Sequence, residues 1–131
     1  MVIDTSAIFA IIAQETDSVR YRDAIKTPPL RLISAVTLLE ITIVLLSKHG
    51  AAAIDVFEEL LREGGVIVVP FDRPLADAAF VAFRRYGEGR GHPAQLNICD
   101  CAAYALAQAQ GLPLLFKGED FARTDVISAL D

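Results

Sequence analysis

The chain has 131 residues, 53% of them hydrophobic, and a formal net charge of −5 at pH 7. This length and composition exclude a disordered chain and favour a single domain over residues 1–131 with a substantial buried core. The acidic balance argues against nonspecific adhesion to nucleic acid through a broadly basic surface.

The sequence also bears on where the protein resides. The longest apolar run, Val36–Leu46, contains Glu40 and is shorter than the roughly 20 residues that a membrane helix needs. The N-terminal sequence lacks the basic segment and cleavage site of a secretion signal. Cys99 and Cys101 are too close together for a scaffold disulfide, and no His/Cys cluster completes a zinc site. We therefore expect a cytoplasmic protein that has no membrane partner.

Short apolar strands alternate with helices along the first half of the chain. Met1–Asp4 is a predicted strand that ends at an acid, and Thr5 or Ser6 can cap the helix that follows as far as about Ala13. The next predicted elements are a helix over Asp17–Lys26, a strand over Leu30–Ser34, and helices over Ala35–Lys48 and Ala51–Arg62.

The second half continues the alternation. Val66–Val69 is a continuous β-branched run, which is typical of a strand buried on both faces. A helix is expected over Pro74–Tyr86, and the glycine-rich segment Gly87–Asn97 is a predicted exposed loop. The remaining predictions are a helix over Asp100–Gln110, a strand over Leu112–Phe116, a loop over Lys117–Phe121 and a fifth candidate strand near Val126–Ile127.

This order of elements predicts the α/β fold class. Strands that alternate with helices pair in parallel through right-handed crossovers, with helices on both faces of the sheet. We expect a three-layer α/β/α sandwich around a parallel sheet of four to five strands. In such sheets the functional cleft lies beyond the carboxyl ends of the strands.

Three acids fall where that cleft is expected. Asp4 ends the first strand, Asp120 follows the strand Leu112–Phe116, and Asp100 begins a helix. Each acid alone has an ordinary explanation, because Asp4 and Asp100 are suitable helix caps and Asp120 could be a surface acid. Glu119 could also take the place of its neighbour Asp120.

Glu40 is a fourth acid, in a helix that is apolar nearly all round. We expect that helix to be buried, where an unpaired charge is costly. The Glu40 carboxylate therefore needs a partner, which could be an arginine or lysine, a proton or a metal cation.

The four acids together predict a metal site. Carboxylates that converge at one sheet edge repel one another and raise one another's pKa values. A divalent cation with a preference for oxygen ligands, such as Mg²⁺ or Mn²⁺, relieves that repulsion. Clustered carboxylates around such a cation are suited to hydrolysis of phosphodiesters.

The same residues carry a resemblance to a known family. They are found in DTSA at Asp4–Ala7, Glu40 in its apolar helix, LNICDCAAYALA at Leu96–Ala107 and LLFKGEDFARTD at Leu114–Asp125. In order and spacing these segments resemble the VapC-type toxins of the PIN-domain ribonuclease family. The resemblance implies a metal-dependent endoribonuclease, the toxin of a type II toxin–antitoxin pair, which a cognate VapB-like antitoxin inhibits.

The resemblance also implies roles for individual residues. Asp4, Glu40, Asp100 and Asp120 correspond to the catalytic acids of the family. Asp4 and Asp100 are the expected ligands of Mg²⁺, with Mn²⁺ as its substitute, and Glu40 and Asp120 are expected to bind it directly or through water. The hydroxyl that members carry near the first acid corresponds to Thr5 or Ser6. One departure is Cys99, because members often have glycine before the acid at position 100.

Partners are predicted from charge and from apolar surface. Five cations near the predicted cleft are candidate RNA contacts, with ordinary surface charge as the alternative. They are Arg84, Arg85, Arg90, Lys117 and Arg123. The helices Ala35–Lys48 and Ala51–Arg62 carry more apolar surface than one sheet face can cover, which favours contacts with an antitoxin and with a second copy, as a homodimer or a toxin–antitoxin hetero-oligomer.

Two kinds of alternative compete with a ribonuclease. Response-regulator receivers and haloacid-dehalogenase-type phosphatases also place acids at strand ends, but this chain lacks the acidic pairs that both require. A catalytically impaired PIN-like module, acting only by binding an antitoxin or RNA, is the non-enzymatic alternative.

Overall fold

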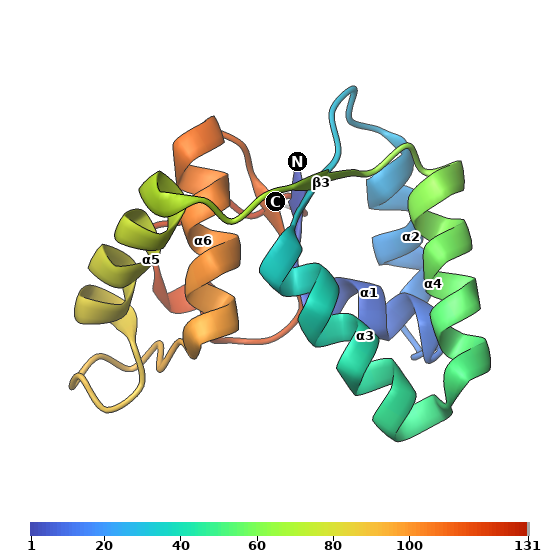
Figure 1. Cartoon of the computed structure of the whole chain (residues 1–131), viewed down its shortest axis with the longest axis horizontal. Helices are drawn as coiled ribbons and strands as arrows, with labels where there is room; N and C mark the ends of the chain where they lie inside the picture. Colours follow the sequence, from blue (N-terminus) through green and yellow to red (C-terminus); the bar gives the residue numbers. More distant parts are fainter. Residues whose placement is uncertain (131) are drawn as a thin grey trace.

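The chain folds into six α-helices around a four-stranded parallel sheet in a computed structural model that describes residues 1–130 (Figure 1). The strands are β1 (Val2–Ile3), β2 (Leu32–Ser34), β3 (Ile67–Val69) and β4 (Leu114–Leu115). The helices are α1 (Thr5–Ile12), α2 (Ser18–Lys26), α3 (Ala35–His49), α4 (Ala51–Glu63), α5 (Arg73–Tyr86) and α6 (Ile98–Gln110), followed by a 3₁₀ helix, η1 (Phe121–Arg123). The sheet order is β3-β2-β1-β4.

The sheet separates two hydrophobic cores. Val2 of β1 pairs with Leu32 of β2 and with Leu114 of β4, and the three side chains pack in one core with α5 and α6. Their neighbours Ile3 and Leu115 lie in the other core with α1, α2, α3 and α4. Because successive residues of a strand point to opposite faces, these short strands fill both cores at once. The predicted three-layer α/β/α sandwich is confirmed, with four strands.

The neighbouring strands β1 and β4 bring two distant loops together. The Asp4 amide donates a hydrogen bond of 2.9 Å to the Leu115 carbonyl, which extends the parallel ladder beyond the end of β1. The residues that follow β1 and β4 therefore leave the sheet side by side. This pairing places the segment after Asp4 beside the segment that begins at Phe116.

Two helix starts differ from the sequence prediction. Asp4 caps α1, since its Oδ2 accepts a hydrogen bond from the Ser6 amide at 3.0 Å; the sequence offers Thr5 or Ser6 as caps, with Asp4 as the alternative. Helix α6 begins at Ile98, before Asp100, because Asn97 is its N-cap. The Asn97 side chain accepts a hydrogen bond from the Asp100 amide at 2.8 Å, and asparagine is a preferred cap residue. Asn97 lies in the segment Gly87–Asn97, which the sequence predicted to be a loop.

The prediction that Val66–Val69 is buried on both faces is wrong. β3 is an outer strand that pairs only with β2, and Ile67 and Val68 are 53% and 38% exposed. The fifth strand is likewise not formed near Val126–Ile127, where the chain makes a single bridge between Leu114 and Ser128. A β-branched run favours a strand but does not reveal its place in the sheet.

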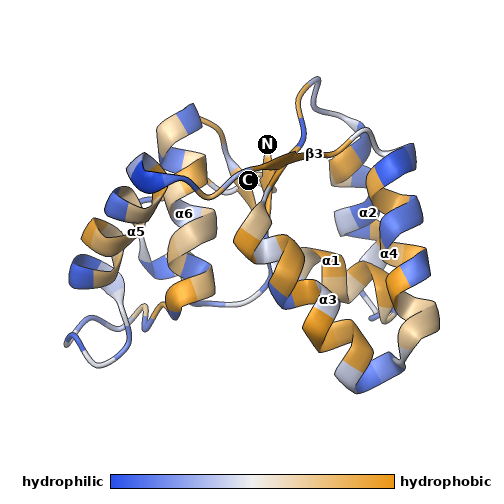
Figure 2. Ribbon diagram, viewed as in Figure 1, coloured by the Kyte–Doolittle hydropathy of each residue, from blue (hydrophilic) through white to orange (hydrophobic). Residues whose placement is uncertain are grey.

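Helix α3 is also less buried than its sequence suggests. Its buried face is formed by Thr37, Ile41 and Leu45. On its outer face Leu39 and Ile43 are exposed, and Figure 2 shows α3 and the neighbouring β3 as mainly apolar. In residues 1–130 no helix is long and apolar enough to cross a membrane.

Arg31 joins the ends of α2 and α4. Its guanidinium donates to the carbonyls of Ile25 and Lys26, the latter at 2.9 Å, and to the Gly64 carbonyl at 3.0 Å. These carbonyls lie at the carboxyl ends of the two helices, where backbone acceptors lack partners within the helix. One side chain therefore satisfies and connects both helix ends.

Candidate active site

Asp4 is the most buried acid of the site. It lies at the carboxyl end of β1 and is 4% exposed. The Ser6 amide and the Ser6 hydroxyl both donate to Asp4 Oδ2, at 3.0 and 2.6 Å. Burial raises the pKa of Asp4, the hydrogen bonds from Ser6 oppose that rise, and the charge of Glu40 adds to it. Asp4 is therefore at once a helix cap and a buried acid at the predicted cleft edge.

Glu40 lies on α3, and α1 supplies its partner. The Thr5 hydroxyl donates a hydrogen bond to Glu40 Oε1. The expectation of a helix buried nearly all round is wrong, because Glu40 is partly exposed and its neighbour Leu39 faces outward. The Thr5 hydroxyl is therefore a partner of Glu40 that the sequence did not indicate, and a metal cation at Glu40 stays a prediction.

Cys99 contacts the same glutamate. Burial, the negative charge of Glu40 and a hydrogen bond to Glu40 raise the pKa of the Cys99 thiol to about 12. The thiol is therefore protonated at neutral pH and can act as a weak donor. Cys99 and Cys101 are both free thiols, as the sequence predicted.

Asp100 is held at the start of α6 by a capping box. Its Oδ2 accepts from the Asn97 amide at 2.9 Å, while the Asp100 amide donates to Asn97. Burial raises the pKa of Asp100 to about 7; the hydrogen bond from Asn97 lowers it, and the charges of Asp4, Glu40 and Asp120 add to the rise. The four predicted acids are therefore close enough for their charges to be coupled through Asp100.

Asp120 comes from the loop after β4. It is exposed, precedes η1 and makes no capping hydrogen bond through its side chain. Its contribution to the raised pKa of Asp100 favours it over Glu119 as the acid of this loop that faces the site.

The acids by themselves do not form a complete set of metal ligands. Within residues 1–130 no three His, Cys, Asp or Glu side chains are grouped closely enough to hold a metal ion by themselves. Apart from the Cys99 thiol, the donors that share the site are carboxylate and hydroxyl oxygens, the type that Mg²⁺ and Mn²⁺ prefer. Metal binding by Asp4 and Asp100 stays a prediction.

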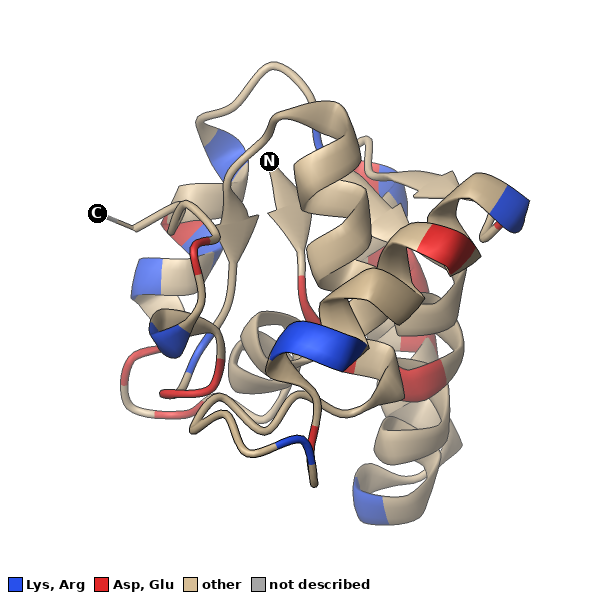
Figure 3. Ribbon diagram, turned by 90° about the vertical axis from the view of Figure 1, so that its left-hand side faces the viewer, with Lys and Arg blue, Asp and Glu red and all other residues tan. Residues whose placement is uncertain are grey.

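Three of the five candidate RNA contacts bind other parts of the protein. Arg85 pairs with Asp125 at 3.3 Å, and Arg123 donates to the Pro93 carbonyl at 3.1 Å. Lys117 pairs with two carboxylates of the α1–α2 connection. Arg84 and Arg90 are exposed, and Figure 3 shows acidic and basic segments interspersed on this side of the molecule. RNA contact by these five residues stays a prediction.

Sequence reasoning missed the contacts of two residues, Asn97, which positions Asp100, and Asp125, which lies outside the site. Asn97 precedes Asp100 by three residues, and this spacing is the local pattern of a capping box, so it could have been found. Asp125 accepts hydrogen bonds from Tyr104 and from Gln108, the latter at 3.3 Å, and so ties the C-terminal segment to α6. No local sequence pattern indicates the contacts of Asp125 with α6, because a strand and a loop separate the partners along the chain.

Comparison with known proteins identifies the fold and the family. The PIN domain family matches residues 1–127. The chain is 43% identical to ribonuclease VapC28 of Mycobacterium tuberculosis over 131 residues, which cover 100% of this chain and 98% of that protein. It is 46% identical to ribonuclease VapC of Mycolicibacterium smegmatis over 126 residues, which cover 96% of this chain and 97% of that protein.

Solved structures agree with this fold. The crystal structure of Mycobacterium tuberculosis VapC20, a sarcin-ricin loop cleaving toxin, superposes with a TM-score of 0.79 at 18% identity, covering 96% of this chain and 95% of that one. A toxin–antitoxin complex from Klebsiella pneumoniae gives a TM-score of 0.68 at 19% identity, covering 92% and 89%. The family match over residues 1–127 and the relatives at 43% and 46% identity show that the chain belongs to the PIN-domain family and, within it, to the VapC group.

Proposed function

We propose that this protein is a divalent-metal-dependent endoribonuclease, the toxin of a type II toxin–antitoxin pair that acts in the cytoplasm. One observation carries the metal dependence: Asp4 is a carboxylate only 4% exposed whose hydrogen-bond donors are the amide and hydroxyl of Ser6, and it lies near enough to Glu40 and Asp100 for the three charges to interact. A site that must hold several carboxylates near one another without a basic partner is suited to a cation.

Asp4 and Asp100 are the proposed direct ligands, and Glu40 and Asp120 bind directly or through water. Mg²⁺ is the proposed ion and Mn²⁺ its substitute, because both favour oxygen ligands and retain bound water. When bound, such an ion supplies an activated water and stabilises the leaving oxygen of the phosphodiester.

The protein's own contribution is to orient the acids before RNA binds. Ser6 donates two hydrogen bonds to Asp4 Oδ2, Thr5 donates to Glu40, and the Asn97 amide donates to Asp100. Each of these three carboxylates therefore has one oxygen held by a neighbour. Side chains that are fixed in this way need little reordering to reach the geometry of the reaction.

A cleavage assay tests this proposal. The purified chain is expected to cleave RNA with Mg²⁺ or Mn²⁺ and to lose activity in EDTA. Asp100→Asn should abolish cleavage, whereas Asp77→Asn should not, because Asp77 is an exposed acid of α5 that pairs with Arg73. Full cleavage in EDTA would refute the metal dependence. Absence of cleavage with intact antitoxin binding would identify the alternative, a catalytically impaired binding module.

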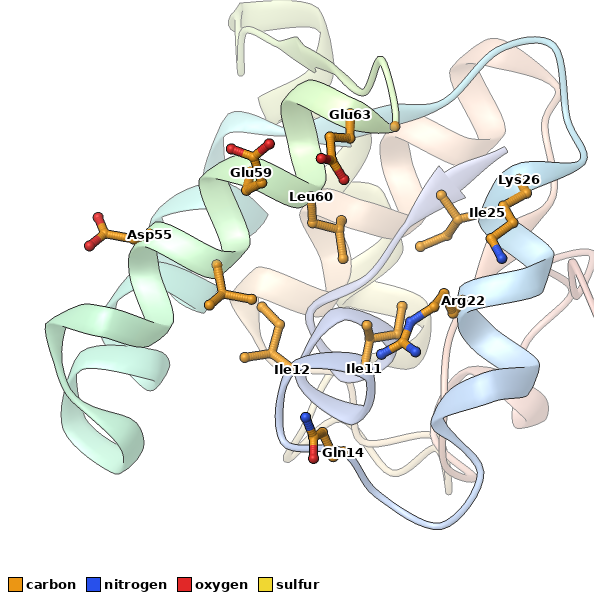
Figure 4. A pocket seen from close by; sticks show the side chains of 12 residues that line it. Ile11, Ile12, Gln14, Arg22, Ile25, Lys26, Asp55, Glu59, Leu60 and Glu63 are labelled. Atoms are coloured by element: carbon orange, nitrogen blue, oxygen red, sulfur yellow. The ribbon is translucent and has the colours of Figure 1, made fainter.

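We propose that the antitoxin docks in a groove formed by α1, α2 and α4. This groove has a volume of about 700 Å³, and Figure 4 shows α2 and α4 as its two walls. Apolar side chains point into it from all three helices. They include Ile11, Ile12, Ile25 and Leu60.

The walls of the groove carry opposite charges. Arg22 and Lys26 lie on α2, and Asp55, Glu59 and Glu63 lie on α4. An amphipathic antitoxin segment with apolar anchors, basic residues towards α4 and acidic residues towards α2 matches this arrangement. An arginine or lysine of the antitoxin that lies outside this segment would pair with Glu40 or Asp120 and compete with the metal.

Two matched variants test the groove. Val56 on α4 lines the groove and Val81 on α5 does not, although the two are similarly exposed, at 55% and 63%. We expect Val56→Lys to weaken co-purification with the antitoxin encoded beside the gene, while Val81→Lys leaves it unchanged. Equal binding by both variants would place the antitoxin elsewhere.

A second copy is the proposed partner of the apolar surface on α3 and β3. Leu39, Ile43 and Leu46 lie along one exposed side of α3, and Ile67 and Val68 are exposed on β3. An outer strand with apolar side chains favours association, and a homodimer would cover it.

A further inference from the structure

Lys117 is connected to Asp4 through a single hydroxyl. Its backbone amide donates to Ser6 Oγ at 2.9 Å, and Ser6 Oγ donates to Asp4 Oδ2 at 2.6 Å. The chain directly after β4 is therefore attached to the most buried acid of the site. Any displacement of Lys117 changes the partner of the hydroxyl that orients Asp4.

The side chain of Lys117 makes a second attachment. Its ammonium group pairs with Glu15 and with Asp17, the latter at 2.8 Å, in the connection between α1 and α2. The three side chains are between 34% and 40% exposed. The pairing lowers the pKa of Asp17 and raises that of Lys117, so both groups are charged at neutral pH.

These attachments restrain the loop that carries Asp120. Lys117 stands three residues before Asp120, and Phe121 after it is buried in the core beneath α5 and α6. Between them Gly118 has a φ of +106°, a conformation that favours glycine. The loop is thus held at Lys117 on one side of Asp120 and at Phe121 on the other.

We propose that Lys117 is a positioning residue that holds Asp4 and Asp120 in place through its pairs with Glu15 and Asp17, and that it is not an RNA contact. This role rests on the proposed ribonuclease activity. Two carboxylates already neutralise the ammonium group, which leaves it little net attraction for a phosphate. The same two carboxylates would repel an RNA backbone that approached them.

The experiment compares two ways of removing the same ion pairs. Lys117→Met removes the cation, and the double variant Glu15→Gln/Asp17→Asn removes the anions and leaves the lysine free. We expect both to lower kcat for RNA cleavage about tenfold with little change in KM, and both to weaken binding of Mg²⁺ in calorimetric titration. Lys117→Arg should restore most of the loss. Arg73→Met, which breaks an exposed ion pair on α5, is the control.

A role in binding RNA gives the opposite pattern. Lys117→Met would then raise KM and reduce the salt dependence of binding by about one ion, and the double variant would bind RNA more tightly. That result would overturn the proposal, as would normal kcat and Mg²⁺ affinity in both variants.

Hydrogen exchange of the metal-free protein supplies a readout without activity. Amides of the segment 117–121 should exchange faster in Lys117→Met and in the double variant than in the wild type or Arg73→Met. Unchanged exchange would also contradict the proposal. If Lys117→Met does not fold, the double variant and Lys117→Arg decide the same question. The wild-type protein could be inactive while the segment 117–121 still exchanges faster in these variants. That outcome would refute the ribonuclease function but not the role of Lys117 in positioning the loop.

Discussion

The hydroxyl of Thr5 donates a hydrogen bond to Glu40, a residue 35 positions further along the chain. This contact joins the start of α1 to the middle of α3 and orients a glutamate that has no basic partner there. Thr5→Val keeps the shape of the side chain and removes the donor. We expect it to lower kcat about tenfold, because Glu40 loses its fixed orientation.

Thr5→Ser is the control for that change, since it retains the hydroxyl. Steady-state cleavage with both variants separates the hydrogen bond from packing. Equal activity of the valine and serine variants would show that the hydroxyl is dispensable.

Asp4→Asn should abolish cleavage and preserve the fold. The amide has nearly the same shape and its oxygen can still accept the hydrogen bonds of Ser6, but the charge of the proposed metal ligand is lost. Calorimetric titration should show that Mg²⁺ and Mn²⁺ affinity is lost, while circular dichroism is unchanged. Cleavage at the wild-type rate would exclude Asp4 as a metal ligand.

The metal-free protein should be less stable at neutral pH than at acidic pH. The pKa of Asp100 is about 7 in the folded protein and close to 4 in the unfolded chain, so the folded state binds the extra proton between those values. The free energy of unfolding should therefore fall as the pH rises from about 4 to about 7 and then level off. The pKa of Asp4 is also raised, so Asp4 likewise lowers the free energy of unfolding as the pH rises.

Asp100→Asn removes one titrating group and keeps an oxygen for the capping box. It should raise the melting temperature of the metal-free protein at pH 7.5 by on the order of 5 °C and flatten the pH profile. The measurement is thermal unfolding in EDTA across this pH range. A steeper profile, or a lower melting temperature, would contradict the coupling of the acids.

Mg²⁺ should stabilise the wild-type protein, because a ligand that binds only the folded state raises its melting temperature. The rise should grow with Mg²⁺ concentration in the millimolar range and should be much smaller in Asp100→Asn. Differential scanning calorimetry with and without Mg²⁺ measures both. Equal shifts in the two proteins would locate the bound ion away from Asp100.

Ile43→Lys should convert the proposed homodimer into a monomer. Ile43 is exposed near the middle of the apolar side of α3, and a charge there cannot be buried without a partner. Light scattering after size exclusion gives the mass in solution, and Lys48→Ala at the end of α3 is the control. A wild-type protein that is monomeric at micromolar concentration would disprove the contact.

The order of strands and helices could be predicted from the sequence, because hydrophobic periodicity and helix stops are local signals. The position of β3 could not, since the run Val66–Val69 looks the same in a central strand and in an outer one. Its exposure is decided by which strands pair, and that depends on contacts far along the chain.

The sequence singled out Asp4, Asp100 and Asp120 by their places at element ends and Glu40 by its apolar helix, but it could not indicate the hydrogen-bond partners of these acids. Glu40 is held by Thr5 and Asp4 by Ser6, and the first of these pairs spans two helices. Lys117 resembles a free cation in the sequence, and only the fold shows that the α1–α2 connection lies beside it. Asn97 differs, because its spacing to Asp100 is a local pattern.

The guanidinium of Arg31 has a consequence for the kinetics of association. By bonding to carbonyls of both α2 and α4, it fixes the separation of the two groove walls in the free toxin. A surface that is formed before its partner arrives loses little conformational entropy on binding, so an antitoxin segment would carry most of the ordering cost itself. The affinity of toxin for antitoxin should then depend strongly on how helical the antitoxin segment is before it binds. Arg31→Met should lower the association rate more than it raises the dissociation rate.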